Sequence, residues 1–144
     1  MFATFLLLLL TAVSGIKCIA LVQPPVMVVK PGESFSVPCK ITGYSATSTC
    51  TNWIRHKSGQ ALEWIGWYCS SSNTGSIDSL KNKIRFSAEA SSNTVILHGR
   101  NFQSEDTAVY YCARARYSGS DAFDYWGKGT TVTVTSAVQS APKS

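Results

Sequence analysis

Apolar residues recur at every second position through much of the chain. This period of two holds over residues 35–41, 94–98, 107–112 and 131–135. Runs of this period that are rich in Val, Ile, Thr and aromatic residues are typical of half-buried β-strands. The pattern therefore predicts several short strands, each with one face turned to a core.

Turn-forming residues separate these runs, at residues 30–33, 57–60 and 91–93. Several short strands with turns at this spacing predict an all-β sandwich or barrel. The segment 101–106 is expected to form one helical turn before the next strand. Pro38 cannot donate a backbone hydrogen bond, so we expect the strand on that side of it to be missing or bulged.

The two ends of the chain differ from the middle. Residues 5–13 are almost all apolar but too short to cross a bilayer, so residues 1–18 are interpreted as a signal peptide cleaved between 15 and 20. The preference for small residues favours cleavage after Gly15, whereas an even number of cysteines favours a later site. The mature domain, 19–136, is then exported without direct membrane contact, and residues 137–144 form a linker or begin a further domain.

Composition narrows the function classes. The chain has 144 residues, 44% of them apolar and 15% charged, which suits one folded domain and excludes a disordered chain. The net charge of +5 comes from scattered Lys and Arg, so we expect no nucleic-acid partner. His56 and His98 have no nucleophile at a recognisable elbow, and no phosphate-binding Gly-rich motif follows a strand. We expect no enzyme, no metal and no cofactor.

Five cysteines suggest disulfides in an exported chain. Cys39 and Cys112 fall on the inward phase of their strands, and we predict a bond between them. Cys50 and Cys69 each lie near a strand end beside a loop, and we predict a second bond there. The alternatives are that these two stay free or that one of them pairs with another chain. Cys18 either leaves with the signal peptide or remains as an odd thiol.

These residues resemble the variable domain of an immunoglobulin. The resemblance lies in Cys39, Trp53 and Cys112, the last preceded by Glu-Asp-Thr-Ala-Val-Tyr-Tyr at 105–111. It implies a V-type β-sandwich, with two antiparallel sheets and Greek-key connections. It covers about residues 21–136, nearly all of the expected mature chain.

Two further motifs are similar to those of heavy chains of the rearranged V-D-J type. They are Trp-Gly-Lys-Gly-Thr at 126–130 and Leu-Glu-Trp-Ile-Gly at 62–66. The glycines Gly127 and Gly129 suit a bulge that bends the last strand around the sandwich edge. On this resemblance, residues 137–144 would begin a constant region.

The resemblance also implies two ion pairs and one unusual core position. Arg85 would pair with Asp106 at the bottom of the domain, and Arg114 with Asp124 at the base of the loop 115–125. Gly99 stands where the family usually has a large apolar residue. Either a neighbour fills that space or the core is slightly loose.

Three loops would gather at one end of such a sandwich, at about 43–52, 67–77 and 115–125. They combine Tyr, Trp and Phe, which give large contact area at low entropic cost, with Ser, Thr, Asn and Gly, which adapt their hydrogen bonds. Turn formation alone does not explain aromatic residues at loop tips. The candidate antigen-binding residues are Tyr44, Ser45, Thr49, Thr51, Trp67, Tyr68, Ser70, Ser71, Asn73, Arg116, Tyr117, Ser118, Asp121 and Phe123.

A second surface would meet a partner chain. Apolar and aromatic residues on the outward phase of their strands indicate an interface. In the family this face meets a light-chain variable domain. The candidate interface residues are Ile54, His56, Leu62, Trp64, Tyr111 and Trp126.

The resemblance thus implies antigen recognition by an antibody heavy chain, paired with a light chain. The complete molecule would be secreted or would lie on the extracellular face of the plasma membrane. The alternative is a germline-encoded V-set receptor or adhesion domain with a fixed ligand. Sequencing transcripts separates the two, because an antibody predicts variation concentrated at 115–125.

Overall fold

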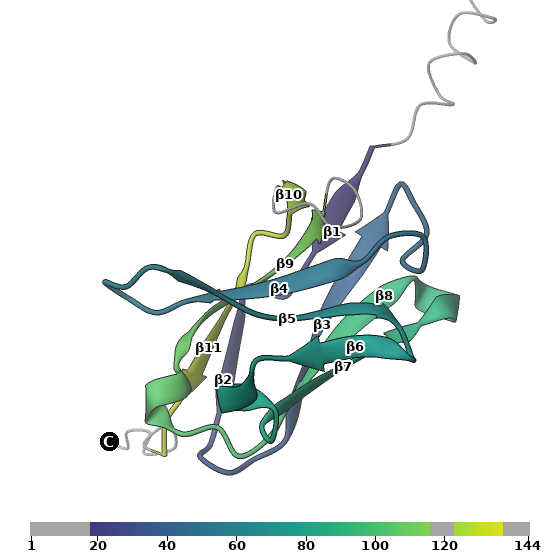
Figure 1. Ribbon diagram of the computed structural model, residues 1–144. Coiled ribbons are helices and arrows are strands. Elements are labelled where there is room, and N and C mark those ends of the chain that lie inside the picture. The colour runs from purple at the N-terminus through teal and green to yellow at the C-terminus, as the bar shows by residue number, and fades with distance from the viewer. Residues whose placement is uncertain (1–17, 116–122, 137–144) are drawn as a thin grey trace, which may run out of the picture.

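The computed structural model describes residues 18–115 and 123–136 (Figure 1). The predicted signal peptide up to residue 17 and the segment 137–144 lie outside the described residues, as does the centre of the third loop. The described chain forms two packed β-sheets joined by short turns (Figure 1). Within these residues no helix has the length and apolar character needed to span a membrane.

The first sheet has four antiparallel strands in the order β1-β3-β8-β7. Their bounds are Ala20–Val22, Phe35–Thr42, Thr94–Gly99 and Ile84–Glu89 for β1, β3, β8 and β7. Residues of β3 alternate between buried and exposed along the strand, as the period of two predicted. The inward residues of this sheet form one side of the core.

The second sheet has the order β2-β11-β9-β4-β5-β6, with β10 paired to β9. The bounds are Val26–Val29 for β2, Thr130–Val134 for β11, Ala108–Ala115 for β9, Thr51–His56 for β4, Leu62–Ser70 for β5, Asn73–Ser76 for β6 and Phe123–Trp126 for β10. Connections such as β3 to β4 and β8 to β9 cross between the sheets. The predicted sandwich is confirmed, with one departure, since β2 runs parallel to β11 and the second sheet is not wholly antiparallel.

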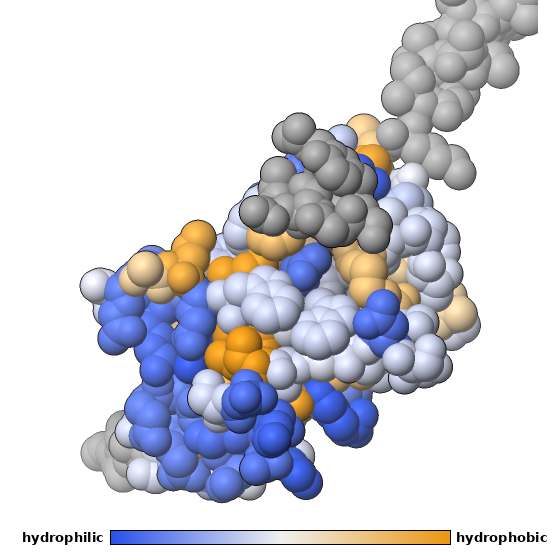
Figure 2. Space-filling model, in the orientation of Figure 1, coloured by the Kyte–Doolittle hydropathy of each residue, from blue (hydrophilic) through white to orange (hydrophobic). Residues whose placement is uncertain are grey.

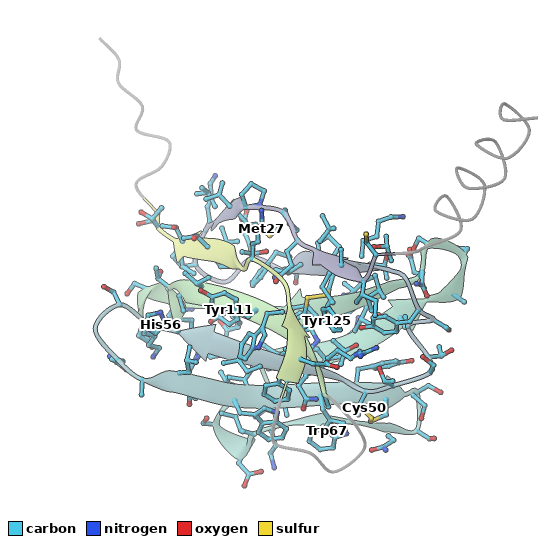
Figure 3. The ribbon with its side chains drawn as sticks, turned by 90° about the horizontal axis from the view of Figure 1, so that it is seen from above. Met27, Cys50, His56, Trp67, Tyr111 and Tyr125 are labelled. Atoms are coloured by element: carbon cyan, nitrogen blue, oxygen red, sulfur yellow. A yellow bond between two sulfur atoms is a disulfide. The ribbon has the colours of Figure 1, made fainter. Side chains whose placement is uncertain are left out.

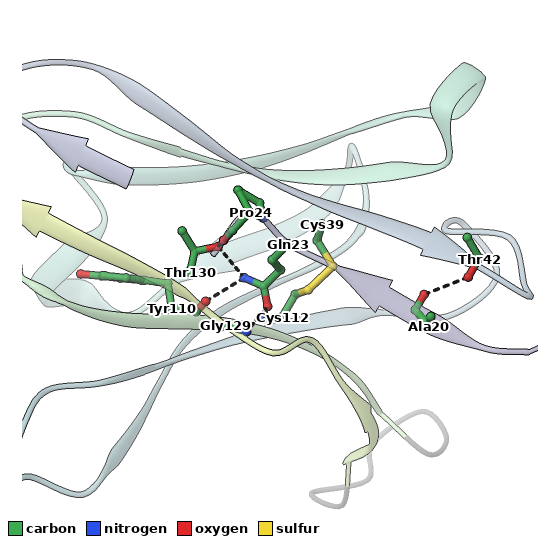
Figure 4. Close-up of a disulfide and its surroundings, with 9 residues drawn as sticks. All are labelled: Ala20, Gln23, Pro24, Cys39, Thr42, Tyr110, Cys112, Gly129 and Thr130. Atoms are coloured by element: carbon green, nitrogen blue, oxygen red, sulfur yellow. Dashed lines mark hydrogen bonds between the residues drawn. A yellow bond between two sulfur atoms is a disulfide. The ribbon is translucent and has the colours of Figure 1, made fainter. Parts of the chain in front are cut away.

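The core lies between the sheets and contains a disulfide. Cys39 of β3 and Cys112 of β9 are bonded and fully buried, as predicted (Figure 4). Trp53 is the register partner of Cys112, and its buried indole stacks on Phe86 of the opposite sheet at 5.6 Å between ring centroids. The bond closes a loop of about 74 residues, which stabilises the folded state by about 4 kcal/mol in the chain-entropy model.

Two local predictions are confirmed, and one alternative that the sequence left open is decided. Pro38 pairs with β8 on one side, and β1 pairs only with residues 40–42, so no strand needs the missing proline amide hydrogen. At Gly99 a neighbour fills the space, because a Cβ there would overlap the ring of Phe35. A single 3₁₀ turn, Ser104–Asp106, precedes β9.

The predicted ion pair between Arg85 and Asp106 is wrong. The buried Asp106 carboxylate instead accepts from Lys83 Nζ at 2.6 Å and lies 3.4 Å from Nη1 of the buried Arg55. Lys83 lies in the turn before β7, whereas Arg85 lies within the strand. Ile84 and Phe86 turn inward, so Arg85 between them projects from the outer face of β7 into solvent.

Gln23 is a structural residue that the sequence analysis missed (Figure 4). Its side-chain nitrogen donates to the carbonyl oxygen of Tyr110 at 2.8 Å, and its side-chain oxygen accepts from the amides of Cys112 and Gly129 at 3.2 and 3.1 Å. Gly129 has φ +92°, and the last strand is interrupted between β10 and β11, where the glycine motif predicted a bend. An amide side chain carries no hydrophobic period, so pattern analysis had no signal for Gln23.

Candidate functional site

A disulfide joins the first predicted loop to the second. Thr51 and Tyr68 are register partners, so the preceding Cys50 and the following Cys69 lie together where the two strands end. They are bonded, with their Cα atoms 4.1 Å apart, and the predicted pairing is confirmed. Figure 3 shows Cys50 next to Trp67 and well apart from His56. The remaining thiol, Cys18, is exposed.

An arginine joins the first loop to the two ends of the third. Arg114 forms a two-pronged ion pair with Asp124, with N–O distances of 3.2 and 2.7 Å, as predicted. Its guanidinium also lies over the rings of Tyr44 and Tyr125, at 4.8 and 5.0 Å from their centroids. Burial raises the pKa of Tyr44 to about 12, although the charge of Arg114 opposes that shift. A guanidinium held by a bidentate carboxylate and two rings fixes the base of the third loop.

The predicted loop residues differ in their exposure. Ser45, Ser70, Ser71 and Asn73 are exposed, whereas Tyr44, Thr49, Trp67 and Phe123 are partly buried. Arg116, Tyr117, Ser118 and Asp121 lie outside the described residues. Two predictions need correction: Thr51 and Tyr68 are only 1% and 7% exposed, because both point into the sandwich. We remove them from the predicted recognition surface.

The predicted partner face is largely exposed. Leu62, Trp64 and Trp126 are 58%, 42% and 41% accessible, which is unusual for such large apolar side chains. Figure 2 shows apolar and aromatic groups, orange to near white, across the middle of the face over β4 and β5. Tyr111 packs edge-on against Trp126, with their ring centroids 5.9 Å apart. Tyr111 and His56 are both partly buried.

Ile54 does not belong to this exposed face, which corrects its prediction. It lies between two aromatic register partners, Trp64 on β5 and Tyr111 on β9, and is only 3% exposed. Alternation gives its direction correctly, but the neighbouring rings cover it. Ile54 therefore supports the face from beneath and cannot contact a partner.

A tryptophan pair connects the two predicted surfaces. Trp64 and Trp67 stack with ring centroids 5.7 Å apart and an angle of 10° between the rings. Each indole nitrogen donates to an asparagine side chain: Trp64 to Asn52 at 2.9 Å and Trp67 to Asn73 at 3.0 Å. These bonds hold both rings in fixed orientations. Sequence analysis missed Asn52, since an asparagine within a strand gives no sign of its partner.

At this end of the sandwich, the described loop residues offer groups suited to non-covalent contacts with another molecule. In the part of the chain that the structure describes, no cluster of three or more His, Cys, Asp or Glu could hold a metal ion. The loops present hydroxyl, amide and aromatic groups on a framework tied by one disulfide and one ion pair. Such an arrangement is typical of a rigid recognition surface.

Comparison with known proteins shows which family and which relatives the chain is similar to. Residues 22–135 match the model of the immunoglobulin V-set domain. The chain is 44% identical over 108 residues to an Ig heavy chain V region, XIG14, of Xenopus laevis, covering 75% of this chain and 79% of that one. It is 43% identical over 136 residues to the Ig heavy chain V region MOPC 315 of Mus musculus (91% and 96%). It is 40% identical over 121 residues to the IgW heavy chain V region W26 of Heterodontus francisci (84% and 99%).

Proposed function

This chain belongs to the immunoglobulin V-set family, and on that premise we propose that it recognises antigen as the variable domain of an antibody heavy chain. It performs no covalent chemistry, and its work is selective binding. One observation carries the proposal: the first, second and third loops are physically tied together at one end, by the Cys50–Cys69 bond and by Arg114.

The recognition surface consists of the accessible loop residues. Trp67 offers an aromatic ring held by Asn73, and Ser45, Ser70 and Ser71 of the first and second loops are exposed. Rigid aromatic groups among small polar ones bind with little loss of side-chain entropy. On this proposal the third-loop residues Arg116, Tyr117, Ser118 and Asp121 also belong to the recognition surface.

The partner is a light-chain variable domain, which covers Leu62, Trp64, Tyr111 and Trp126. The large exposed areas of these side chains favour a partner, because isolated soluble domains seldom expose such a contiguous apolar patch. The paired molecule is secreted or lies on the outer surface of the cell. A germline-encoded receptor with a fixed ligand remains the competing function.

The test begins with paired expression and transcript sequencing. Co-expression with light chains of the same animal should yield a stable heterodimer, and Trp64→Ser together with Leu62→Ser should weaken that pairing at least tenfold. Transcripts should vary chiefly at 115–125 above a constant framework. Identical sequences at 115–125 in every individual would instead establish the fixed-ligand receptor.

The loop disulfide pre-organises the recognition surface. The bond closes a loop of about 20 residues, for which the chain-entropy model gives about 3 kcal/mol of stability. In the folded domain it also restrains residues 43–50 against β5, which lowers the entropy lost on binding. With an antigen selected from a library, the double variant Cys50→Ser, Cys69→Ser should bind more weakly per folded molecule. Unchanged affinity together with a large loss of stability would show that the bond serves only the fold.

A further inference from the structure

A hollow of about 470 Å³ lies far from the recognition loops. It opens where β3 and β7 begin and β8 ends, whereas the first loop follows the opposite end of β3 (Figure 1). The chain segment 81–83 closes one side of it. On the sheet side, His98 is the register partner of both Ser36 on β3 and Arg85 on β7, so these three residues lie in a row across the strands. The bottom of the view in Figure 2 shows a surface that is almost entirely hydrophilic.

The lining of this hollow is basic and contains no carboxylate. Four of its side chains are cationic: Lys81, Lys83, Arg85 and Arg100. Lys83 is already paired with Asp106, at 2.6 Å. The other three are exposed, and no carboxylate of the described residues lies within 4.0 Å of them. Three uncompensated positive charges around one concave surface concentrate anions there.

Several contacts in the hollow fix its shape. Nε of Arg100 donates to the carbonyl oxygen of Asn82 at 3.1 Å, which orients the guanidinium and leaves its terminal nitrogens for a ligand. The ring of His98 is held between Ser36 and Ser87, with N–O distances of 3.3 and 2.7 Å. Burial and the nearby charge of Arg85 both lower the pKa of His98. Its ring is therefore uncharged at pH 7 and adds no positive charge to the hollow.

We propose that this hollow binds a tetrahedral oxyanion, as a sulfate or phosphate ester carried on a small polyhydroxy molecule. Guanidinium groups recognise such oxygens through paired hydrogen bonds, and a lysine adds a point charge. The hydroxyls of Ser34 and Ser36 and the amide of Asn82 supply further donors, and the volume suits a small ligand. Nucleic acid is disfavoured because binding a single strand uses exposed aromatic rings for base stacking, and the only rings in this lining, Phe35 and His98, are both partly buried.

This site is independent of antigen recognition, so either proposal can fail alone. Calorimetric titration of the full chain would use three probes: sucrose octasulfate, inositol hexakisphosphate and inorganic phosphate. We expect one binding site per heavy chain for at least one of the first two probes. Preference for the sulfated probe identifies a sulfate ester as the natural group, and preference for the phosphorylated one identifies a phosphate ester.

Matched variants separate a built site from general charge. Lys81→Gln, Arg85→Gln and Arg100→Gln together should weaken binding at least tenfold. The control replaces three exposed lysines elsewhere, Lys30, Lys40 and Lys128, by Gln and should change it less than twofold. Circular dichroism verifies that both variants are folded, and Ser36→Glu, which places a carboxylate in the hollow, should also abolish binding. Equal losses in the two triple variants, no 1:1 binding of any probe, or tighter binding of a single-stranded oligonucleotide would each overturn the proposal.

Discussion

The charge cluster beneath the sandwich offers a sharp test of the packing described above. Asp106 is about 5% exposed and accepts hydrogen bonds from Lys83 Nζ at 2.6 Å and from the amide of Gln103 at 2.9 Å. The buried guanidinium of Arg55 lies 3.4 Å away. Truncating Asp106 to Ala would leave Arg55 in a poorly hydrated site with only its ion pair to the partly exposed Glu63, at 2.7 Å. We therefore expect a loss at the low end of the range for buried pairs.

The expected cost follows from that burial. Removing one partner of a buried pair typically destabilises a protein by about 3–5 kcal/mol, which is a large part of the roughly 5–15 kcal/mol that holds a domain folded. Lys83→Met should cost less, about 2 kcal/mol, because Lys83 is partly exposed and Asp106 keeps its other donors. Arg85→Met is the matched control, and it should change stability by less than about 0.5 kcal/mol because Arg85 lies in solvent.

Urea unfolding monitored by tryptophan fluorescence measures these differences. With a slope of about 2 kcal/mol per molar urea, a loss of 3 kcal/mol lowers the midpoint of unfolding by about 1.5 M.

The same carboxylate makes stability depend on pH. Burial alone would raise the pKa of Asp106, but the Gln103 amide and Lys83 lower it below its usual value. The carboxylate therefore stabilises the fold above roughly pH 4, and the gap between wild type and Asp106→Ala should shrink as the pH falls through the lowered pKa. If Arg85→Met destabilises as much as Lys83→Met, the partner assignment is refuted.

Three further substitutions test other parts of the framework. Gln23→Ala removes hydrogen bonds to three backbone groups and should cost about 2–4 kcal/mol in urea unfolding, with the exposed Gln60→Ala as a neutral control. Gly99→Leu should lower the melting temperature by several degrees, because its Cβ would overlap the ring of Phe35, and a rise in melting temperature would contradict that packing. Tyr110→Phe loses the hydroxyl that donates to the Asp106 carbonyl at 2.6 Å and should cost about 1 kcal/mol in the same assay, whereas no loss would show that this bond is not stabilising.

Sequence alone was enough for the strands β3, β8, β9 and β11 and for the core disulfide, and the family resemblance added the general position of the loops. Period-two alternation assigns each side chain to one face of its strand, and Cys39 and Cys112 were placed inward for that reason alone. Their bond, and the bond between Cys50 and Cys69 at adjoining strand ends, follow the predicted pairing. These features depend on local order along the chain, which a sequence records directly.

Tertiary structure decided which groups meet and which remain accessible. Alternation turned Ile54 outward, but only the packing of Trp64 and Tyr111 shows that it is covered. Asp106 takes Lys83 as its partner because Lys83 lies in the turn before β7, whereas Arg85 lies within the strand, on its exposed face. Contacts of this kind form between residues far apart in sequence, so they depend on the relative placement of two sheets and on the volume of the side chains between them. No period or spacing along a single chain encodes that placement.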